Sequence, residues 1–428
     1  MLFVGVSAVI GCGGSVMLLA GGVWTLSLTG SSSLAALAAP AFYLPTLLGP
    51  LIGSLADRLP RKPLLIWTCL ITALVLLSLL AVRSSDQLWL IYLVMAAYGV
   101  SFVLVDVGDS ALLPAALPSA GLGLVNGLRT SAQEGMKLIA PLLGAALFAW
   151  QGGYPVAVLA AALLLVAAGL YWAIRIRPPA GGSLSRPPAD GMSDATIEPE
   201  RRTVRVRDGL RYLWRHPVLR PVILLGGSTI ALSGVSTAAV YEAVTTGLHR
   251  PPEFMGVLAS AQGAGSLLGG LIVGRLLTGR GEGVTGGVGA VLVAAGATAW
   301  FVPWWPVTLL GSLLVGLGLP WTLVAAMTAV QTRTPSDLLG RVAGTANTVL
   351  FAPTALATPI GAALVLIDRR LPLFIVVVVA LTTGVSTLIR MRHVGPVADP
   401  EPSSAVPDPH PVGTARGAEP DRSGLSGS

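Results

Sequence analysis

Charged side chains are scarce in this chain. Only 11% of its 428 residues are Asp, Glu, Lys or Arg, whereas 53% are hydrophobic. Ordinary water-soluble domains carry about 25% charged residues, which they need to cover their surface. The scarcity excludes a typical soluble protein and predicts an all-α integral membrane protein.

Residues that build metal, redox and nucleophilic sites are also few. The two cysteines, Cys12 and Cys69, lie in apolar stretches without metal-like spacing, and we interpret them as packing residues. The four histidines flank apolar stretches or lie in the polar tail, which disfavours a histidine proton relay. No acid cluster or nucleophile with its base occurs at a spacing suited to catalysis. We therefore expect neither an enzyme nor a cofactor or metal.

The apolar residues come in runs of about 20, which as helices cross a hydrocarbon core about 30 Å thick. Backbone groups in lipid must pair within their own segment, so these runs predict α-helices. The chain begins apolar at Met1, and we expect no cleavable signal sequence. The twelve predicted spans are residues 2–27, 35–56, 63–82, 88–111, 120–149, 155–175, 219–245, 254–277, 284–303, 307–331, 342–366 and 372–391.

Basic residues are distributed unevenly between the two sides that these spans define. Of the 27 Lys and Arg residues, all but Arg83, Arg250, Arg369 and Arg370 fall on or near the side that holds both termini. Cytoplasmic loops are enriched in Lys and Arg, so the pattern predicts a cell-membrane protein with both termini in the cytoplasm. The net charge of +7 then reflects orientation, and we expect the lipid bilayer but no nucleic acid as a partner.

The second half of the chain repeats landmarks of the first at a constant offset. Gly53 and Arg58 recur 217 residues later as Gly270 and Arg275. Such a register predicts a duplicated bundle of six plus six helices. The same offset pairs Pro118 with Pro335, Gly123 with Gly340, Gly127 with Gly344, and Gly144 with Gly361.

These features divide the chain into four predicted segments. Residues 1–176 and 219–392 form two pseudo-symmetric six-helix bundles. Residues 177–218 form a cytoplasmic linker that begins rich in Pro, Gly and Ser. Residues 393–428 have almost no large apolar side chains and are predicted to be a disordered cytoplasmic tail.

The end of the linker carries apolar residues at helical spacing among arginines, namely Val206, Leu210, Leu213 and Trp214. One interpretation is an amphipathic helix on the inner leaflet, with its arginines near anionic head groups. The other is that these arginines only enforce orientation. The sequence leaves both open.

Residues 53–62 read GSLADRLPRK, a short basic loop between two apolar spans. The segment resembles the signature loop between helices 2 and 3 of major facilitator superfamily transporters. That pattern is Gly, three residues, Asp, Arg, any residue, Gly, Arg, and then Arg or Lys. Pro60 stands where the pattern has its second glycine, which stiffens the turn. The matching residues are Gly53, Asp57, Arg58, Arg61 and Lys62.

Other strings resemble the drug and siderophore exporter branch, which includes macrolide efflux proteins and the enterobactin exporter. They are SLTGSSSLAALAAPAFYLPTLLGPLIGSLADR, NGLRTSAQEGMKLIAPLLGAAL, GLRYLWRHPVLR and TPSDLLGRVAG. The resemblance implies the twelve-helix major facilitator fold and a monomeric secondary transporter. We expect proton-coupled efflux of a small, largely apolar compound such as a drug, siderophore or secondary metabolite. A lipid or lysolipid translocator, or an importer, is the alternative.

The resemblance also implies a gating latch on the cytoplasmic side. In the family, the Asp at position 57 faces the start of helix 11, where the helix dipole favours a carboxylate. The Arg at position 58 can pair with an acid on helix 4; Asp106 and Asp109 lie about 27 and 31 Å from the outer end of span 88–111. The alternatives are basic residues that only set orientation and an Asp109 that is a simple interfacial carboxylate. The predicted latch comprises Gly53, Asp57, Arg58, Arg61, Lys62, Asp106 and Asp109.

Two charges occur near the middle of span 120–149. Counted from Leu122, Glu134 and Lys137 lie about 18 and 22 Å into the bilayer, where a charge is costly. Their i,i+3 spacing allows them to pair. A carboxylate that alternates between this lysine and a proton would couple transport to protons; a permanent structural ion pair is the alternative. The four acidic and basic positions 106, 109, 134 and 137 have uncharged counterparts in the second repeat, which places coupling in the first half.

The same span carries Gly135, Pro141 and Gly144, which incompletely resemble the helix 5 motif of superfamily antiporters, and ordinary helix packing explains them equally well. Polar and aromatic residues inside the spans are candidates for a central substrate cavity, although Ser and Thr often bond their own helix. These candidates are Ser15, Trp24, Gln133, Gln262, Trp321, Asn347 and Thr348.

Overall fold

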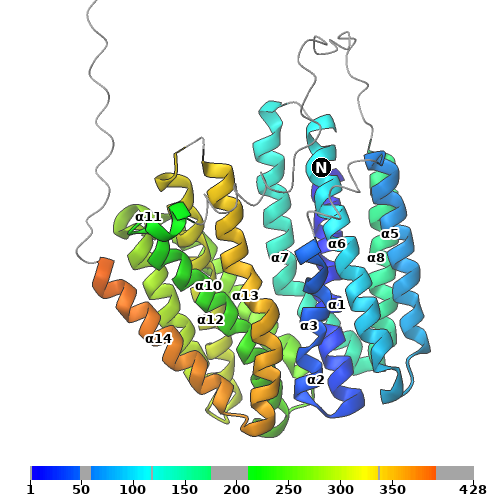
Figure 1. The fold of residues 1–428 in the computed structure, drawn as a ribbon. Coiled ribbons are helices and arrows are strands. Elements are labelled where there is room, and N and C mark those ends of the chain that lie inside the picture. The colour runs from blue at the N-terminus through cyan, green and yellow to red at the C-terminus, as the bar shows by residue number, and fades with distance from the viewer. Residues whose placement is uncertain (1, 49–58, 117–118, 175–210, 336–337, 392–428) are drawn as a thin grey trace, which may run out of the picture. The chain divides into compact units, whose positions relative to one another are not determined.

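The computed structural model describes residues 2–48, 59–116, 119–174, 211–335 and 338–391, and in these ranges all regular structure is helical. Figure 1 shows how the chain runs through these helices. Gly53, Asp57 and Arg58 of the predicted latch lie outside the described residues, as do the tail 393–428 and most of the linker.

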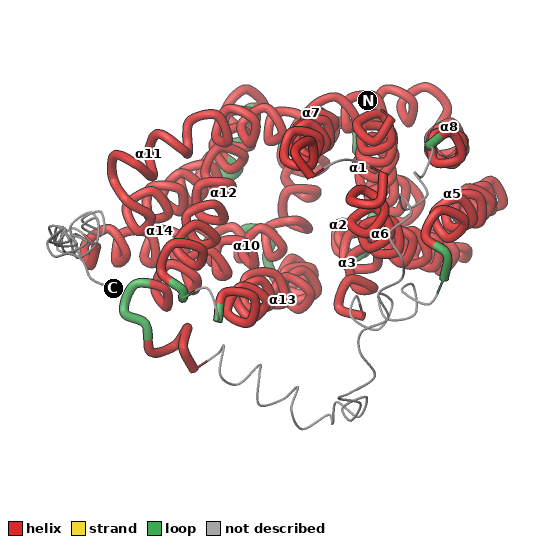
Figure 2. The backbone as a smooth tube through the Cα atoms, turned by 90° about the horizontal axis from the view of Figure 1, so that it is seen from above, coloured by secondary structure: helices red, strands yellow, loops and turns green. Residues whose placement is uncertain are grey.

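The first half contains short and long helices around one apolar core. Figure 2 shows α1, α5, α6, α7 and α8 end on. The helices are α1 (Leu2–Thr29), α2 (Ser32–Ala36), α3 (Ala38–Tyr43), η1 (Leu44–Leu48), α5 (Arg61–Leu77), η2 (Ser78–Ala81), η3 (Ser85–Gln87), α6 (Leu88–Ala116), α7 (Ser119–Gln151) and α8 (Gly153–Ala173).

The second half is built from longer helices. A helical turn at residues 211–215 precedes them, and its Leu213 is fully buried beside Leu219, Val222 and Val330. The linker's end therefore packs on this half. The helices are α10 (Leu219–Glu242), the π-helix η4 (Ala243–Gly247), α11 (Phe254–Ala299), α12 (Trp305–Arg333), α13 (Leu339–Ile367) and α14 (Leu371–Met391).

Nine helices in the described ranges are long and apolar enough to cross a membrane. One of them, α11, has 46 residues, about 69 Å at 1.5 Å per residue. It bends at Gly281, whose φ of 76° is one that residues with a Cβ rarely adopt. It therefore makes two crossings. With α11 counted twice, the nine helices give ten crossings. The charged α7, which is not among the nine, and the segment that begins with α2 supply the remaining two of the predicted twelve.

The second crossing differs from the continuous span predicted at residues 35–56. Its described part consists of α2, α3 and η1 in succession. Pro40 and Pro45 lack the N–H that helix continuation needs. Here α3 approaches α6 so closely that a Cβ on Gly99 would overlap the Phe42 carbonyl.

Successive crossings alternate in direction, so the helices share two ends. We call the end that holds Arg61 and the start of α10 the Arg61 end. The opposite end, which holds Gly30 and the end of α10, is the Gly30 end. In the predicted orientation the Arg61 end faces the cytoplasm.

Candidate functional site

A polar network joins four helices near the Arg61 end of the first half. Asp109 of α6 is buried, and its Oδ2 accepts a hydrogen bond from Arg129 Nη2 of α7 at 2.5 Å. The hydroxyl of Tyr171 of α8 donates to Asp109 Oδ1 at 2.7 Å. Arg129 Nε donates to Ser7 Oγ of α1 at 2.9 Å. A buried carboxylate thus holds both a cation and a hydroxyl, as a buried charge requires.

In this network Asp109 has partners that the sequence did not predict. Arg129, Tyr171 and Ser7 were missed because they lie on three other helices, although an arginine within a predicted span was a signal for Arg129. All four residues belong to the first half, so the network fixes its helices to one another. The pairing of Arg58 with Asp109 stays a prediction, because Arg58 lies outside the described residues.

Other residues of the predicted latch lie at the same end. Lys62 Nζ donates to the carbonyl oxygens of Trp172 and Ile174 at 2.7 and 2.8 Å. These carbonyls close α8, where a cation is favoured by the helix dipole. Asp106 is exposed, one turn before Asp109, and Arg61 begins α5.

Glu134 and Lys137 form the ion pair that their spacing allowed. Lys137 Nζ donates to Glu134 Oε1 at 2.6 Å. The exposed fractions of the two side chains are 44% for Glu134 and 56% for Lys137, far above those of the Asp109 network. The pair is therefore open to its surroundings, and α7 carries one buried and one accessible charge pair.

The position of Glu134 on α7 shows which way this pair faces. Pro141 and Ala145 of α7 contact α11, since a Cβ on Gly256 would meet the Pro141 carbonyl and the Ala145 methyl group. At 100° per residue, Glu134 lies within about 20° of both on the helix surface. Glu134 therefore lies on the stripe of α7 that faces the second half.

On α11, the facing stripe consists of glycines seven or four residues apart. A Cβ added to Gly263 would lie 2.7 Å from the Lys137 carbonyl oxygen. One added to Gly270 or Gly274 would meet nothing within 4 Å. Hence α7 and α11 are in contact toward the Gly30 end and separate toward the Arg61 end. The separation begins close to Glu134.

Side chains at the Gly30 end connect the two halves directly. Ser32 Oγ of α2 donates to Glu242 Oε2 of α10 at 2.5 Å, and Ser33 Oγ donates to the Ala362 carbonyl oxygen of α13 at 2.7 Å. The buried Tyr241 occupies the space that a Cβ on Gly22 of α1 would need. We call Ser32, Ser33, Tyr241 and Glu242 the Gly30-end contact. This contact could not be predicted from the sequence, because residues 210 and 329 positions apart carry no pairing signal.

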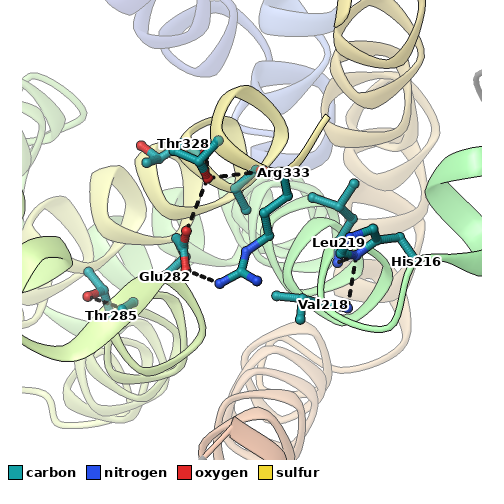
Figure 3. Close-up of polar contacts among 10 residues, drawn as sticks. His216, Val218, Leu219, Glu282, Thr285, Thr328 and Arg333 are labelled. Atoms are coloured by element: carbon teal, nitrogen blue, oxygen red, sulfur yellow. Dashed lines mark hydrogen bonds and ion pairs between the residues drawn. The ribbon is translucent and has the colours of Figure 1, made fainter. Parts of the chain in front are cut away.

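The second half has its own polar network at the Arg61 end (Figure 3). Arg333 Nη2 of α12 pairs with Glu282 Oε2 of α11 at 3.0 Å, and Thr332 donates to Glu282 Oε1 at 3.2 Å. His216 Nδ1 accepts the backbone N–H groups of Val218 and Leu219. Burial, and then the nearby Arg333 cation, lower the pKa of His216, which favours the neutral ring that this acceptor role requires.

The predicted cavity residues fall in different surroundings. Trp24 is buried in the core of the first half, with its ring edge-on to Tyr154 at 5.6 Å. Trp321 is buried, and its Nε1 donates to the Gly269 carbonyl oxygen at 3.0 Å. Ser15, Gln133 and Gln262 are half-buried, whereas Asn347 and Thr348 are exposed.

Comparison with known proteins identifies this arrangement. The family model of the Major Facilitator Superfamily matches residues 1–358. The chain belongs to the Major Facilitator Superfamily. It is therefore a multi-pass membrane transporter by family. A relative, the uncharacterized MFS-type transporter YfiS of Bacillus subtilis (strain 168), is 23% identical over 344 residues, which cover 76% of this chain and 75% of the relative.

Solved superfamily structures share the fold at low sequence identity. The nucleoside transporter NupG has a TM-score of 0.66 and 12% identity, with 92% of this chain and 98% of that chain covered. A bacterial homologue of the iron transporter ferroportin, in an inward-facing state, has a TM-score of 0.60 and 17% identity, with 90% and 98% covered. A bacterial homologue of the lysosomal transporter Spinster, inward-facing and occupied, has a TM-score of 0.63 and 14% identity, with 91% and 92% covered.

Proposed function

We propose that this superfamily member is a proton-coupled exporter of a small, largely apolar compound that works by alternating access in the cell membrane. The sequence resemblance to the drug and siderophore exporter branch supports the substrate class and direction. The basic residues support a cytoplasmic Arg61 end.

The glycine stripe of α11 is the observation that carries the alternating-access part of this proposal. Gly256 and Gly263 are in contact with α7, whereas Gly270 and Gly274 are free of neighbours. The described state is thus closed between α7 and α11 at the Gly30 end and separated toward the Arg61 end. Export requires the opposite state as well, in which the Gly30 end opens.

The accessible Glu134 is the candidate proton carrier. Its carboxylate lies where α7 and α11 separate, and its partner Lys137 is one turn away. Proton uptake by Glu134 would release Lys137, so the charge beside the substrate path would change during the cycle. The Asp109 network is buried and joins helices of one half, so we assign it to the rigidity of that half.

Removing the hydrogen bond between the halves should favour the state that is open at the Gly30 end. Glu242→Ala leaves Ser32 without its charged acceptor, and a hydrogen bond to a charged group contributes about 1.5–3 kcal/mol. We expect an Ala36→Cys reporter, buried at this end, to react with maleimide about tenfold faster or more in this variant. Cys12 and Cys69 are replaced by alanine in every protein compared.

Thr246→Ala is the matched control for this measurement. It removes the other hydrogen bond to the Glu242 carboxylate, which Thr246 donates from the same half at 2.7 Å. Its labelling rate should stay near that of the reporter alone. Equal rates in Glu242→Ala and the reporter alone would show that the contact does not hold this end closed.

Direction and substrate class are tested together by untargeted metabolite profiling. A deletion strain, its parent and a complemented strain are compared inside cells and in the medium. Export predicts a small apolar compound that accumulates inside the deletion cells and is depleted from their medium. Depletion inside the cells would instead indicate an importer, and a shift confined to membrane lipids would indicate a lipid translocator.

A further inference from the structure

A cavity of about 220 Å³ lies at the Gly30 end of the second half. Three chain segments line it: η4 with the residues after it, the turn that follows α11, and the start of α14. Neither Glu134 nor any glycine of the stripe between α7 and α11 lines this cavity, so the proposed transport path does not account for it.

The ionisable side chains that line this cavity are His249, Arg369 and Arg370. Two acids close in sequence to the lining residues, Asp368 and Glu242, are already hydrogen-bonded. Asp368 Oδ1 accepts the backbone N–H of Arg370 at 2.7 Å, and the Glu242 carboxylate accepts from Ser32 and Thr246. Arginine side chains present a planar fork of donors that suits phosphate. Within the described part of the chain, neither Arg369 nor Arg370 forms a side-chain ion pair.

These arginines lie on the predicted outer side, whereas most basic residues of the chain lie on or near the predicted cytoplasmic side. Only four basic residues fall on the predicted outer side, and two of them, Arg369 and Arg370, line this cavity. A third, Arg250, follows the lining residue His249 in sequence. The Arg250 guanidinium lies 5.8 Å from the centre of the Phe254 ring. Because orientation disfavours basic residues on this side, their concentration at one cavity needs a local reason.

The backbone beside the cavity is also unusual. The π-helix η4 interrupts the end of α10, and such bulges occur often at functional sites. His249 has a φ of 51°, which is uncommon for a residue with a Cβ and is held only where its surroundings require it. Both deviations turn the chain so that Thr246 and His249 face the same cavity as the two arginines.

We propose that this cavity is a phosphate-binding site on the outer face, with Arg369 and Arg370 as its principal ligands. The volume equals that of about seven water molecules at about 30 Å³ each, enough for a phosphate group and its immediate substituent. The apolar wall formed by Phe301 and Leu373 suits a phosphate attached to a lipid at the membrane surface. Trp304 and Trp305, next along the chain, are residues that favour that interface.

Binding is tested on the purified full chain in detergent with three probes: phosphatidylglycerol, phosphatidylcholine and inorganic phosphate. Lipid adducts are counted by native mass spectrometry, and the thermal unfolding midpoint is measured with each probe. We expect phosphatidylglycerol to bind and raise the midpoint. The double variant Arg369→Gln/Arg370→Gln should bind it at least about tenfold more weakly, because hydrogen bonds between charged groups contribute more binding free energy than neutral ones.

Arg83→Gln is the matched control, because Arg83 is the fourth outer basic residue and does not line the cavity. It should bind like the wild type. A midpoint raised equally by inorganic phosphate, and lost in the double variant, would assign the site to a free anion. Equal binding of phosphatidylglycerol by wild type and double variant, or equal binding of phosphatidylcholine, would overturn the proposal. The single variant Arg369→Gln replaces the double variant if the latter unfolds.

Discussion

Glu134→Gln is expected to abolish transport driven by a pH gradient. The variant keeps the shape of the side chain and its hydrogen-bonding oxygen, but it cannot gain and lose a proton. The compound that accumulates in deletion cells is loaded into proteoliposomes, and its flux is followed after a pH gradient is imposed. We expect flux at the background level of protein-free liposomes.

Exchange without a gradient separates proton coupling from general damage. Unlabelled and labelled substrate can exchange across Glu134→Gln proteoliposomes if the halves still move, so this rate should persist. Glu134→Asp keeps an ionisable carboxylate and should recover part of the driven flux.

The alternative of a permanent structural ion pair makes the opposite prediction. Exposed ion pairs contribute only about 0.2–1 kcal/mol, and both side chains here are about half exposed. The folding of Glu134→Gln should therefore be near that of the wild type. Driven flux that equals the wild type would rule out Glu134 as the proton carrier.

Asp109→Ala is expected to cause the largest loss of stability. It leaves the Arg129 cation, whose side chain is 13% exposed, without its carboxylate, and leaves the buried Tyr171 hydroxyl without an acceptor. Removal of one partner of a buried ion pair costs about 3–5 kcal/mol. The thermal unfolding midpoint of the purified protein should fall accordingly.

A second substitution identifies the cause of that loss. Asp109→Ala/Arg129→Met removes the stranded cation and should recover much of the midpoint, because an uncompensated buried charge is the main cost. Glu134→Gln, which removes the carboxylate of the accessible Glu134–Lys137 pair, is the control and should change the unfolding midpoint little. If Asp109→Ala unfolds at the wild-type midpoint, the network does not stabilise the first half.

Much of the fold follows from the sequence for a physical reason. The thickness of a bilayer sets the length of each apolar run, and unpaired backbone in lipid leaves helices as the solution. The predicted starts at Leu88 and Leu219 coincide with the first residues of α6 and α10. The span at residues 35–56 was wrong as one continuous helix, because proline and close packing on α6 break its described part.

The candidate site was predicted only in part. Spacing along one helix was enough for Glu134 and Lys137, since i,i+3 neighbours meet whatever surrounds them. No such rule applies to Asp109 with Arg129, or to Ser32 with Glu242, which come from separate helices. Their meeting depends on helix rotation and on how close small residues allow two helices to come.

The sequence alone predicts a duplicated membrane bundle in which the charges at positions 106, 109, 134 and 137 occur only in the first repeat, because hydrophobic length and residue type act locally along each helix. Tertiary packing sets which charges are buried, which side chains join the halves, and where α7 and α11 separate. It also gathered Arg369 and Arg370 around a cavity with His249, more than 100 residues away. These properties arise from packing between distant segments, which no local pattern records.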